Sequence, residues 1–346
     1  MQYNKLFLTG LLASVFFLSC ESDDSGNQTP LGTYDNGVLI VNEGTASAGT
    51  ITYISNDMLA IQQDVYGAEN PGDGIGGYVQ SIFFDGEKAF IISNGSNKIT
   101  VVNRYTFELI DKIETGLQIP RYGVVLNGKA YVTNQASFES LTDDYVAVID
   151  LETYAVESTI ALQAIGEKIL EANGSLYVAN GTFGLGDAVT VINPGTNAIV
   201  TTIGLNISPN SFEVENGILY VLCSNYENPS RLVKIDVSTN EILDEFGFPP
   251  TLANAQNLTI ENGKIYFTVN ADIFSAPLNT TAISATPLFT TTATTVYGFA
   301  VENSRIYIAD AKDFASDGEV SIYSAAGVLQ RTFAVGLIPN GFYFND

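Results

Sequence analysis

The sequence predicts an all-β chain folded as a seven-bladed β-propeller, with four antiparallel strands in each blade. Three observations predict this fold. A phrase of about eight residues recurs along the chain, its clear copies lie 41 to 46 residues apart, and apolar and polar residues alternate within each copy. A period of two indicates strands, and units of this length are typical of propeller blades.

The recurring phrase is "NGKAYVTN" at 127–134, with copies that begin at 173, 216, 262 and 303. A weaker first copy begins at Asn36 and another surrounds Phe90, which makes seven units. One aromatic residue marks each of the six clearer copies: Phe90, Tyr131, Tyr177, Tyr220, Tyr266 and Tyr307.

The third unit shows the four strands of a blade in order. "YGVVL" (122–126) is the first strand, and "NG" (127–128) is a tight hairpin turn, because both of its positions favour positive φ. "KAYVTN" (129–134), "DYVAVID" (144–150) and "AVESTIAL" (155–162) are the second, third and fourth strands. We find no segment with helical periodicity after residue 20, so we expect no helical domain.

The ends of the chain predict how the ring closes. The first unit begins with a second strand, "VLIVNE", because a polar segment precedes it, and the chain ends with "PNGFYFND", which matches a first strand. The last strand therefore completes blade one, and pairing the two ends removes exposed strand edges.

Composition narrows the function. The chain has 38 acidic and 14 basic residues, a net charge of -24, so it repels phosphate backbones and nucleic acid is excluded as a partner. It has no histidine, which excludes histidine-based catalytic triads and imidazole metal sites. Its two cysteines are too few for a disulfide framework, and Cys223 is expected to be a buried apolar side chain.

The first residues are typical of a secretory signal. Residues 1–19 hold one lysine and a short apolar run, and "FLSC" resembles a bacterial lipobox, which implies cleavage before Cys20 and lipidation of its thiol. An uncleaved anchor and a plain secretory signal are the alternatives. Residues 20–35 are polar and acidic and read as a flexible tether, leaving 36–346 for the propeller. An acidic stretch after the lipidated cysteine resembles the surface-export signal of Bacteroidetes-type lipoproteins, which implies the outer face of the outer membrane.

The blade phrases carry a family resemblance. "YVTN", "VID" and "STIAL", repeated with "NG" turns, resemble the YVTN-type seven-bladed propeller family of bacterial surface and periplasmic proteins, over the whole mature chain. Relatives with lipoprotein signals include cobalamin-binding surface propellers that cap outer-membrane corrinoid transporters. The likeness to that branch is in organisation, and no ligand motif is shared.

Function on such a scaffold is expected in the loops on one face, where second-to-third-strand loops and blade-to-blade links emerge. Four of these loops carry an aromatic residue, which suits a flat, partly apolar ligand or a protein partner: Phe138, Phe183, Tyr226 and Phe314. Each ring could instead fold onto its own blade.

The blade links are expected to place further side chains near the axis. Amides and phenols there can form hydrogen bonds with a polar ligand without selecting for charge. Arg121 and Asn134, which begins the loop of the third blade, are added to them. The candidates are Tyr78, Gln80, Arg121, Tyr122, Asn134, Asn210, Asn257, Tyr297 and Asn340. Arg121 could clamp an anion or pair with a neighbouring acid.

We expect no cofactor, and calcium is the one candidate metal. Asp310, Asp313, Asp317 and Glu319 share one loop, and Asp143 and Asp144 are adjacent in another, but neither has the order of an EF-hand. The glycine-rich "GDGIGG" (72–77) lacks the lysine and helix of a phosphate-binding loop.

Three functions remain. The first is a monomeric surface lipoprotein without enzymatic activity, which binds a small ligand or protein on its loop face. It would serve nutrient capture for an outer-membrane transporter, with corrinoids as one candidate nutrient. The second is a protein-interaction scaffold or adhesin. The third is a calcium-dependent propeller hydrolase or lyase, which would need a metal held on the axis.

Overall fold

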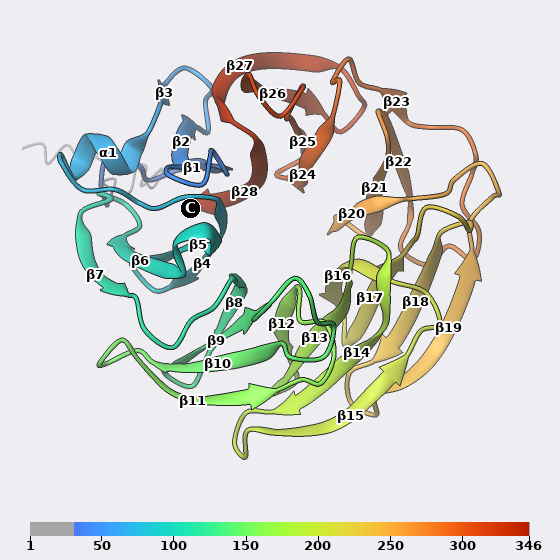
Figure 1. Cartoon of the computed structure of the whole chain (residues 1–346). Coiled ribbons are helices and arrows are strands. Elements are labelled where there is room, and N and C mark those ends of the chain that lie inside the picture. The colour runs from blue at the N-terminus through green and yellow to red at the C-terminus, as the bar shows by residue number, and fades with distance from the viewer. Residues whose placement is uncertain (1–30, 346) are drawn as a thin grey trace, which may run out of the picture. The chain divides into compact units, whose positions relative to one another are not determined.

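The computed structural model describes residues 31–345, which form a closed ring of seven four-stranded antiparallel sheets (Figure 1). The predicted fold class is therefore confirmed, with one sheet for each predicted blade. The predicted signal at 1–19, Cys20 and the first part of the tether lie outside the described residues.

The strands of each blade are ordered from the axis outward. Blades one to four contain β28 (Pro339–Asn345), β1 (Gly37–Asn42), β2 (Thr50–Ser55) and β3 (Ile61–Gln62); β4 (Val79–Asp85), β5 (Lys88–Ser93), β6 (Lys98–Asn103) and β7 (Leu109–Ile113); β8 (Pro120–Leu126), β9 (Lys129–Asn134), β10 (Tyr145–Asp150) and β11 (Ala155–Ala161); and β12 (Ile169–Ala172), β13 (Ser175–Thr182), β14 (Leu185–Asn193) and β15 (Ala198–Gly204).

Blades five to seven continue in the same way. They contain β16 (Pro209–Glu215), β17 (Ile218–Cys223), β18 (Arg231–Asp236) and β19 (Glu241–Gly247); β20 (Gln256–Glu261), β21 (Lys264–Val269), β22 (Asp272–Pro277) and β23 (Phe289–Thr290); and β24 (Val296–Glu302), β25 (Arg305–Asp310), β26 (Asp317–Ser324) and β27 (Leu329–Leu337).

The packing between blades explains why the phrase repeats. The described residues contain seven buried hydrophobic clusters, one at each contact between neighbouring blades. In blade three, Ala130 and Val132 pack toward blade two, whereas Tyr131, between them in β9, packs toward blade four. The marker aromatic of the other five clear copies likewise joins the cluster shared with the following blade. Both faces of each second strand are thus buried, as the alternating pattern requires.

The hairpin turns have the predicted geometry. Asn127 and Gly128 have φ values of 53° and 74°, and the Asn-Gly pairs at 173, 216 and 262 adopt the same positive values. In blade seven Ser304 takes the glycine position at φ 59°, a conformation that costs a side-chain-bearing residue free energy.

The ring closes as predicted. β28 pairs antiparallel with β1, and Gly37 lies opposite Asn345. The Asn345 side chain is fully buried, and its amide donates hydrogen bonds to the backbone carbonyls of Tyr34 and Arg104. The Arg104 guanidinium donates in return to the Asn345 side chain and to the Phe344 carbonyl. These contacts tie the last strand to blades one and two.

Some features differ from the sequence expectations. A short helix, α1 (Val65–Glu69), and a single 3-10 turn, η1 (Asn94–Ser96), occur within the ring, and both are too short to give a helical period. The outermost strands β3 and β23 have only two residues each. The folded unit begins before Asn36, because Tyr34 is buried against Tyr53 and Phe107 and its hydroxyl donates to Glu69.

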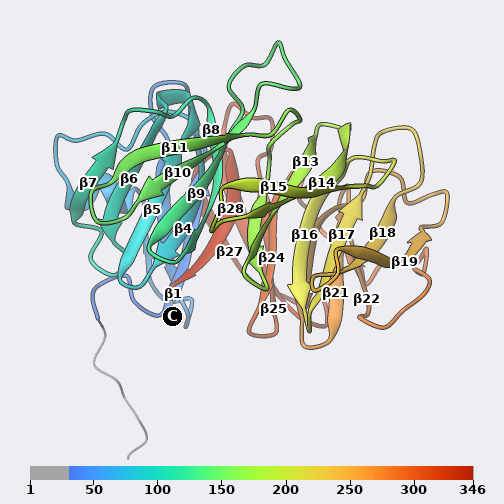
Figure 2. The same ribbon diagram turned by 90° about the horizontal axis from the view of Figure 1, so that it is seen from below.

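The ring has two distinct faces (Figure 2). The first-to-second-strand turns, such as those of β16–β17 and β24–β25, lie at the bottom of Figure 2, and the long loop after β9 rises from the opposite side. We call that opposite side the loop face. Among the described residues no helix is long and apolar enough to cross a membrane.

Replacing Asn345 with alanine tests the closure. Asn345→Ala leaves two buried backbone carbonyls without their donor, so the free energy of unfolding should fall by about 2–4 kcal/mol. Denaturant titration monitored by circular dichroism measures this. The exposed Asn228→Ala is the control and should unfold at the wild-type midpoint. An unchanged midpoint for Asn345→Ala would show that the strand pairing alone closes the ring.

Candidate functional site

A cavity of about 770 Å³ opens on the axis at the loop face. Its wall contains eleven of the thirteen ligand-binding candidates: Tyr78, Gln80, Arg121, Tyr122, Phe138, Phe183, Asn210, Tyr226, Asn257, Tyr297 and Asn340. Most of the candidates therefore lie in the wall, since residues from all seven blades converge where the innermost strands begin.

Asn134 and Phe314 lie elsewhere. Asn134 is fully buried at the end of β9, where its amide donates to the Val132 carbonyl at 2.9 Å and its side-chain oxygen accepts from the Gln118 N–H at 2.8 Å. It supports the blade, and its neighbour Gln135 lines the cavity instead. Phe314 packs edge-on against the Tyr297 ring, with 5.2 Å between ring centroids, behind the cavity wall.

A ring of seven side chains surrounds the axis. Each comes from the position six residues before the first-to-second-strand turn, or its equivalent in blades one and two, and all seven line the cavity: Asn340, Gln80, Arg121, Glu167, Asn210, Gln256 and Tyr297. We call these residues the axial ring. Glu167 and Gln256 were missed by the sequence analysis, although counting back from each Asn of a turn would have found them.

A second set of wall residues directly follows the second strand of a blade: Glu43, Asn94, Gln135, Ser224 and Asn270. None of these five residues was a candidate from the sequence. Their shared place in the repeat was the available signal.

The charged members of the axial ring are paired. The Arg121 Nε and Nη2 atoms donate to the two carboxylate oxygens of Glu167 at 3.0 and 2.7 Å, and Nη1 donates to Gln80 Oε1 at 2.6 Å. Burial disfavours the charged guanidinium, but attraction to Glu167 outweighs this and raises the pKa of Arg121. Of the two roles that the sequence allows for Arg121, an anion clamp or an internal pair, the geometry is that of an internal pair.

Glu43, which is not in the axial ring, accepts hydrogen bonds from two of its members. Its Oε1 atom accepts from the Asn340 amide at 3.0 Å and from the Tyr297 hydroxyl at 3.2 Å. Burial raises the pKa of the Glu43 carboxyl, and these two hydrogen bonds oppose the shift. On the far side, the Asn210 amide donates to Ser224 Oγ and to the Ala255 carbonyl.

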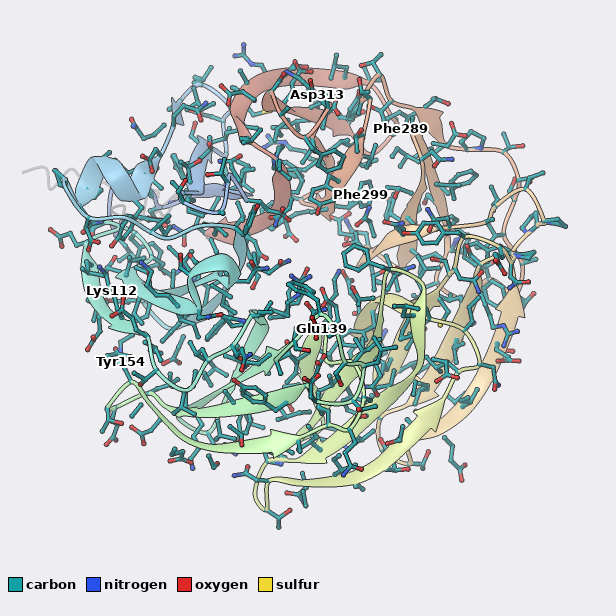
Figure 3. All side chains as sticks on the ribbon, viewed as in Figure 1. Lys112, Glu139, Tyr154, Phe289, Phe299 and Asp313 are labelled. Atoms are coloured by element: carbon teal, nitrogen blue, oxygen red, sulfur yellow. The ribbon has the colours of Figure 1, made fainter. Side chains whose placement is uncertain are left out.

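Exposed aromatic side chains stand at the mouth of the cavity. Phe138, Phe183 and Tyr226 are 75%, 72% and 65% exposed, and each belongs to a second-to-third-strand loop, of blades three, four and five in turn. These three rings therefore do not fold onto their blades. Viewed down the axis, the loop bearing Glu139, the neighbour of Phe138, lies at the margin of the central opening (Figure 3).

Two of the carboxylates considered for calcium, Asp310 and Asp313, are held by backbone hydrogen bonds. Asp310 accepts from the backbone N–H groups of Thr294, Thr295 and Lys312, and Asp313 accepts from the two residues that follow Phe314. Within residues 31–345, no three acidic or cysteine side chains lie close enough to hold a metal ion. Cys223 is a buried free thiol, as predicted.

Asp144 is buried near the cavity and only half satisfied. One carboxylate oxygen accepts from the Gly166 N–H at 2.7 Å, and the other has no partner among the described residues. Burial raises the pKa of Asp144 from 3.8 to about 6, with a further rise from Asp143 and Glu167 and an opposing effect of the Gly166 hydrogen bond.

Residues 36–327 match the family described as "Domain of unknown function (DUF5074)". The chain belongs to this family. No curated protein matches the sequence significantly.

Solved structures share the propeller fold at low sequence identity. A quinoprotein alcohol dehydrogenase-like protein from Bacteroides thetaiotaomicron superposes with a TM-score of 0.67 and 15% identity, covering 90% of this chain and 79% of that one. A functionally unknown protein from Desulfotomaculum acetoxidans gives 0.66 and 11%, covering 89% and 98%. BamB from Moraxella catarrhalis gives 0.53 and 14%, covering 88% and 85%. At these identities the likeness concerns the fold alone.

Asp144→Asn is expected to change how stability depends on pH. Between about pH 4 and pH 6 the folded state holds a proton on Asp144 that the unfolded state releases, so wild-type stability falls as pH rises through this window. Asparagine does not titrate. The free energy of unfolding of the variant, relative to that of the wild type, should therefore rise by about 1–2 kcal/mol from pH 4 to pH 7, after allowance for solvent screening.

Urea unfolding of both proteins at several pH values measures this difference. Asp187→Asn, at an exposed position of blade four, is the control and should follow the wild type. A constant difference between Asp144→Asn and the wild type across the window would contradict the prediction.

Proposed function

We propose that this protein is an outer-membrane surface lipoprotein that binds a ligand in its axial cavity and serves nutrient capture for a transporter. The observation that carries the proposal is the cavity itself, with hydrogen-bonding side chains from every blade at its wall and exposed aromatic rings at its mouth. Binding sites commonly combine apolar contact area with a few converging polar groups.

The axial ring suits a ligand with a polar periphery. Its five uncharged members are amides and a phenol, which both donate and accept hydrogen bonds. The cavity volume of about 770 Å³ lies within the range of small-molecule and cofactor sites. A protein scaffold would favour a flat face, so the cavity supports the ligand-binding hypothesis over the scaffold alternative.

The conformation of Phe183 supports a role for the aromatic mouth. Phe183 has a φ of 49° at the tip of the β13–β14 hairpin and is followed by Gly184 at φ 78°. A bulky residue in this left-handed region is strained, and an exposed phenylalanine gains little from packing in return. A ligand that packs against the ring would offset this cost.

A corrinoid is the specific ligand we propose. A corrin is a flat macrocycle whose edge carries amide groups, so its faces would pack against aromatic rings and its edge would meet the axial ring. The resemblance to cobalamin-binding surface propellers supports the same choice, and the "FLSC" segment supports a lipid anchor at Cys20. The internal pairing of Arg121 with Glu167 is consistent with binding without chemical conversion.

Cyanocobalamin and dicyanocobinamide titrations by calorimetry test the ligand. We expect both to bind to the wild type. Phe183→Ala should weaken binding by about tenfold because it removes an aromatic contact worth about 1.4 kcal/mol. Leu59→Ala removes a side chain of similar exposure, 76%, outside the cavity wall, and should bind as the wild type does. Absence of heat with both corrinoids would refute the corrinoid proposal.

Cys20→Ser tests the lipid anchor. The wild type, expressed in a Gram-negative host fed with a radiolabelled fatty acid, should incorporate label and sediment with outer membranes. Cys20→Ser should incorporate none and be released in soluble form. Cys223→Ser leaves the lipobox intact and should remain labelled. Label in Cys20→Ser would contradict lipidation at this residue.

A further inference from the structure

Lys168 differs from the other charged residues of the cavity wall. Arg121 and Glu167 bind each other through two hydrogen bonds, and Glu43 accepts from Asn340 and Tyr297. Lys168 lines the same cavity, yet its ammonium makes no hydrogen bond or ion pair with any residue in 31–345. Its ammonium lies over the face of the Tyr122 ring, 5.9 Å from the ring centroid.

The acids nearest to Lys168 already have partners. Glu167 is held by Arg121, and Glu213 accepts from Thr259 Oγ1 at 2.8 Å and from the Ile260 N–H at 2.6 Å. Both acids attract Lys168 from beyond contact distance, whereas burial lowers the pKa of its ammonium. A partly buried cation without a direct acceptor costs free energy, and an anion bound in the cavity would offset that cost.

The position of Lys168 also links it to the aromatic mouth. It directly follows Glu167 of the axial ring and precedes β12 of blade four, the blade whose β13–β14 hairpin carries Phe183. Phe138 belongs to the preceding blade, which also supplies Arg121 and Tyr122. The cavity therefore combines a cation with aromatic rings in blades three and four, whereas its wall in blades six and seven is uncharged.

The charge of the cavity contrasts with that of the whole chain. Two acidic and two basic side chains line it, Glu43, Glu167, Arg121 and Lys168, in a chain with 38 acidic and 14 basic residues. Local balance of charge makes the cavity a place in this acidic protein where an anion is not repelled.

We infer that Lys168 binds an anionic group of the ligand, a phosphate or a carboxylate, while a planar part of the same molecule packs against Phe138 and Phe183. This inference rests on the proposed ligand-binding function and adds the chemical class of the ligand. Lysine suits this role because its ammonium is a compact charge with three donors.

Two fluorescent probes that share their aromatic rings separate the contributions of charge and ring. Anilinonaphthalene sulfonate carries an anion, and phenylnaphthylamine is its uncharged counterpart. We expect the wild type to bind the sulfonate more tightly. Lys168→Met should lower affinity for the sulfonate by about tenfold and leave affinity for the uncharged probe unchanged.

Matched variants define the controls. Lys168→Arg keeps the charge and should retain most of the preference for the sulfonate. Lys264→Met removes an exposed lysine outside the cavity wall and should bind both probes as the wild type does. Phe183→Ala should lower affinity for both probes, because it removes the aromatic contact that both make. Competition by phenyl phosphate, benzoate and benzyl alcohol then distinguishes phosphate, carboxylate and an uncharged group as the bound chemistry.

The outcomes separate this inference from the proposed function. Suppose that both probes bind, that Phe183→Ala lowers affinity for both, and that Lys168→Met changes affinity for neither. The cavity then binds ligands, but the assignment of Lys168 is wrong. If neither probe binds, or Phe183→Ala has no effect on either, ligand binding in the cavity itself is refuted. Equal competition by benzyl alcohol and the two anions would also overturn the anionic assignment.

Discussion

The structure depends on one packing interaction, repeated in six of the seven blades: an aromatic side chain of the second strand packs against the following blade. Tyr131, Tyr177 and their counterparts are at most 5% exposed. The Tyr177 hydroxyl also donates to the Val237 carbonyl of the next blade at 3.0 Å. Because each blade buries one strand face against each neighbour, a blade cannot bury its apolar residues alone, and the closing contacts of Asn345 matter to every blade.

The same packing leaves the axis free for function. Apolar side chains between the blades carry the stability, so the residue at the entry of each innermost strand faces the cavity without a packing role. This accounts for the chemical variety of the axial ring, which holds amides, a phenol, an arginine and a glutamate at one repeat position. The loops that follow the second strands differ in sequence for the same reason, and three of them carry an exposed aromatic side chain.

Much of the site was predictable because repeat position sets distance from the axis. Asn210, Asn257 and Asn340 were found in this way, and Glu167 could have been. Asn134 was not distinguishable from its neighbour Gln135, since a shift of one residue along a strand reverses the face. Phe314 resembled Phe183 in sequence, and only the contact with the Tyr297 ring separates a supporting residue from one at the mouth.

The sequence by itself determined the number of blades, the strand order, the hairpin turns and the closure, because period, turn chemistry and repeat length are local properties of a chain. Only the tertiary structure decided which charges are paired. Arg121 and Glu167 are 46 residues apart and meet because neighbouring blades present the same position to the axis. Lys168 adjoins Glu167 in the chain yet has no such partner among the described residues, because Glu167 is already held by Arg121 and Glu213 by Thr259 and Ile260.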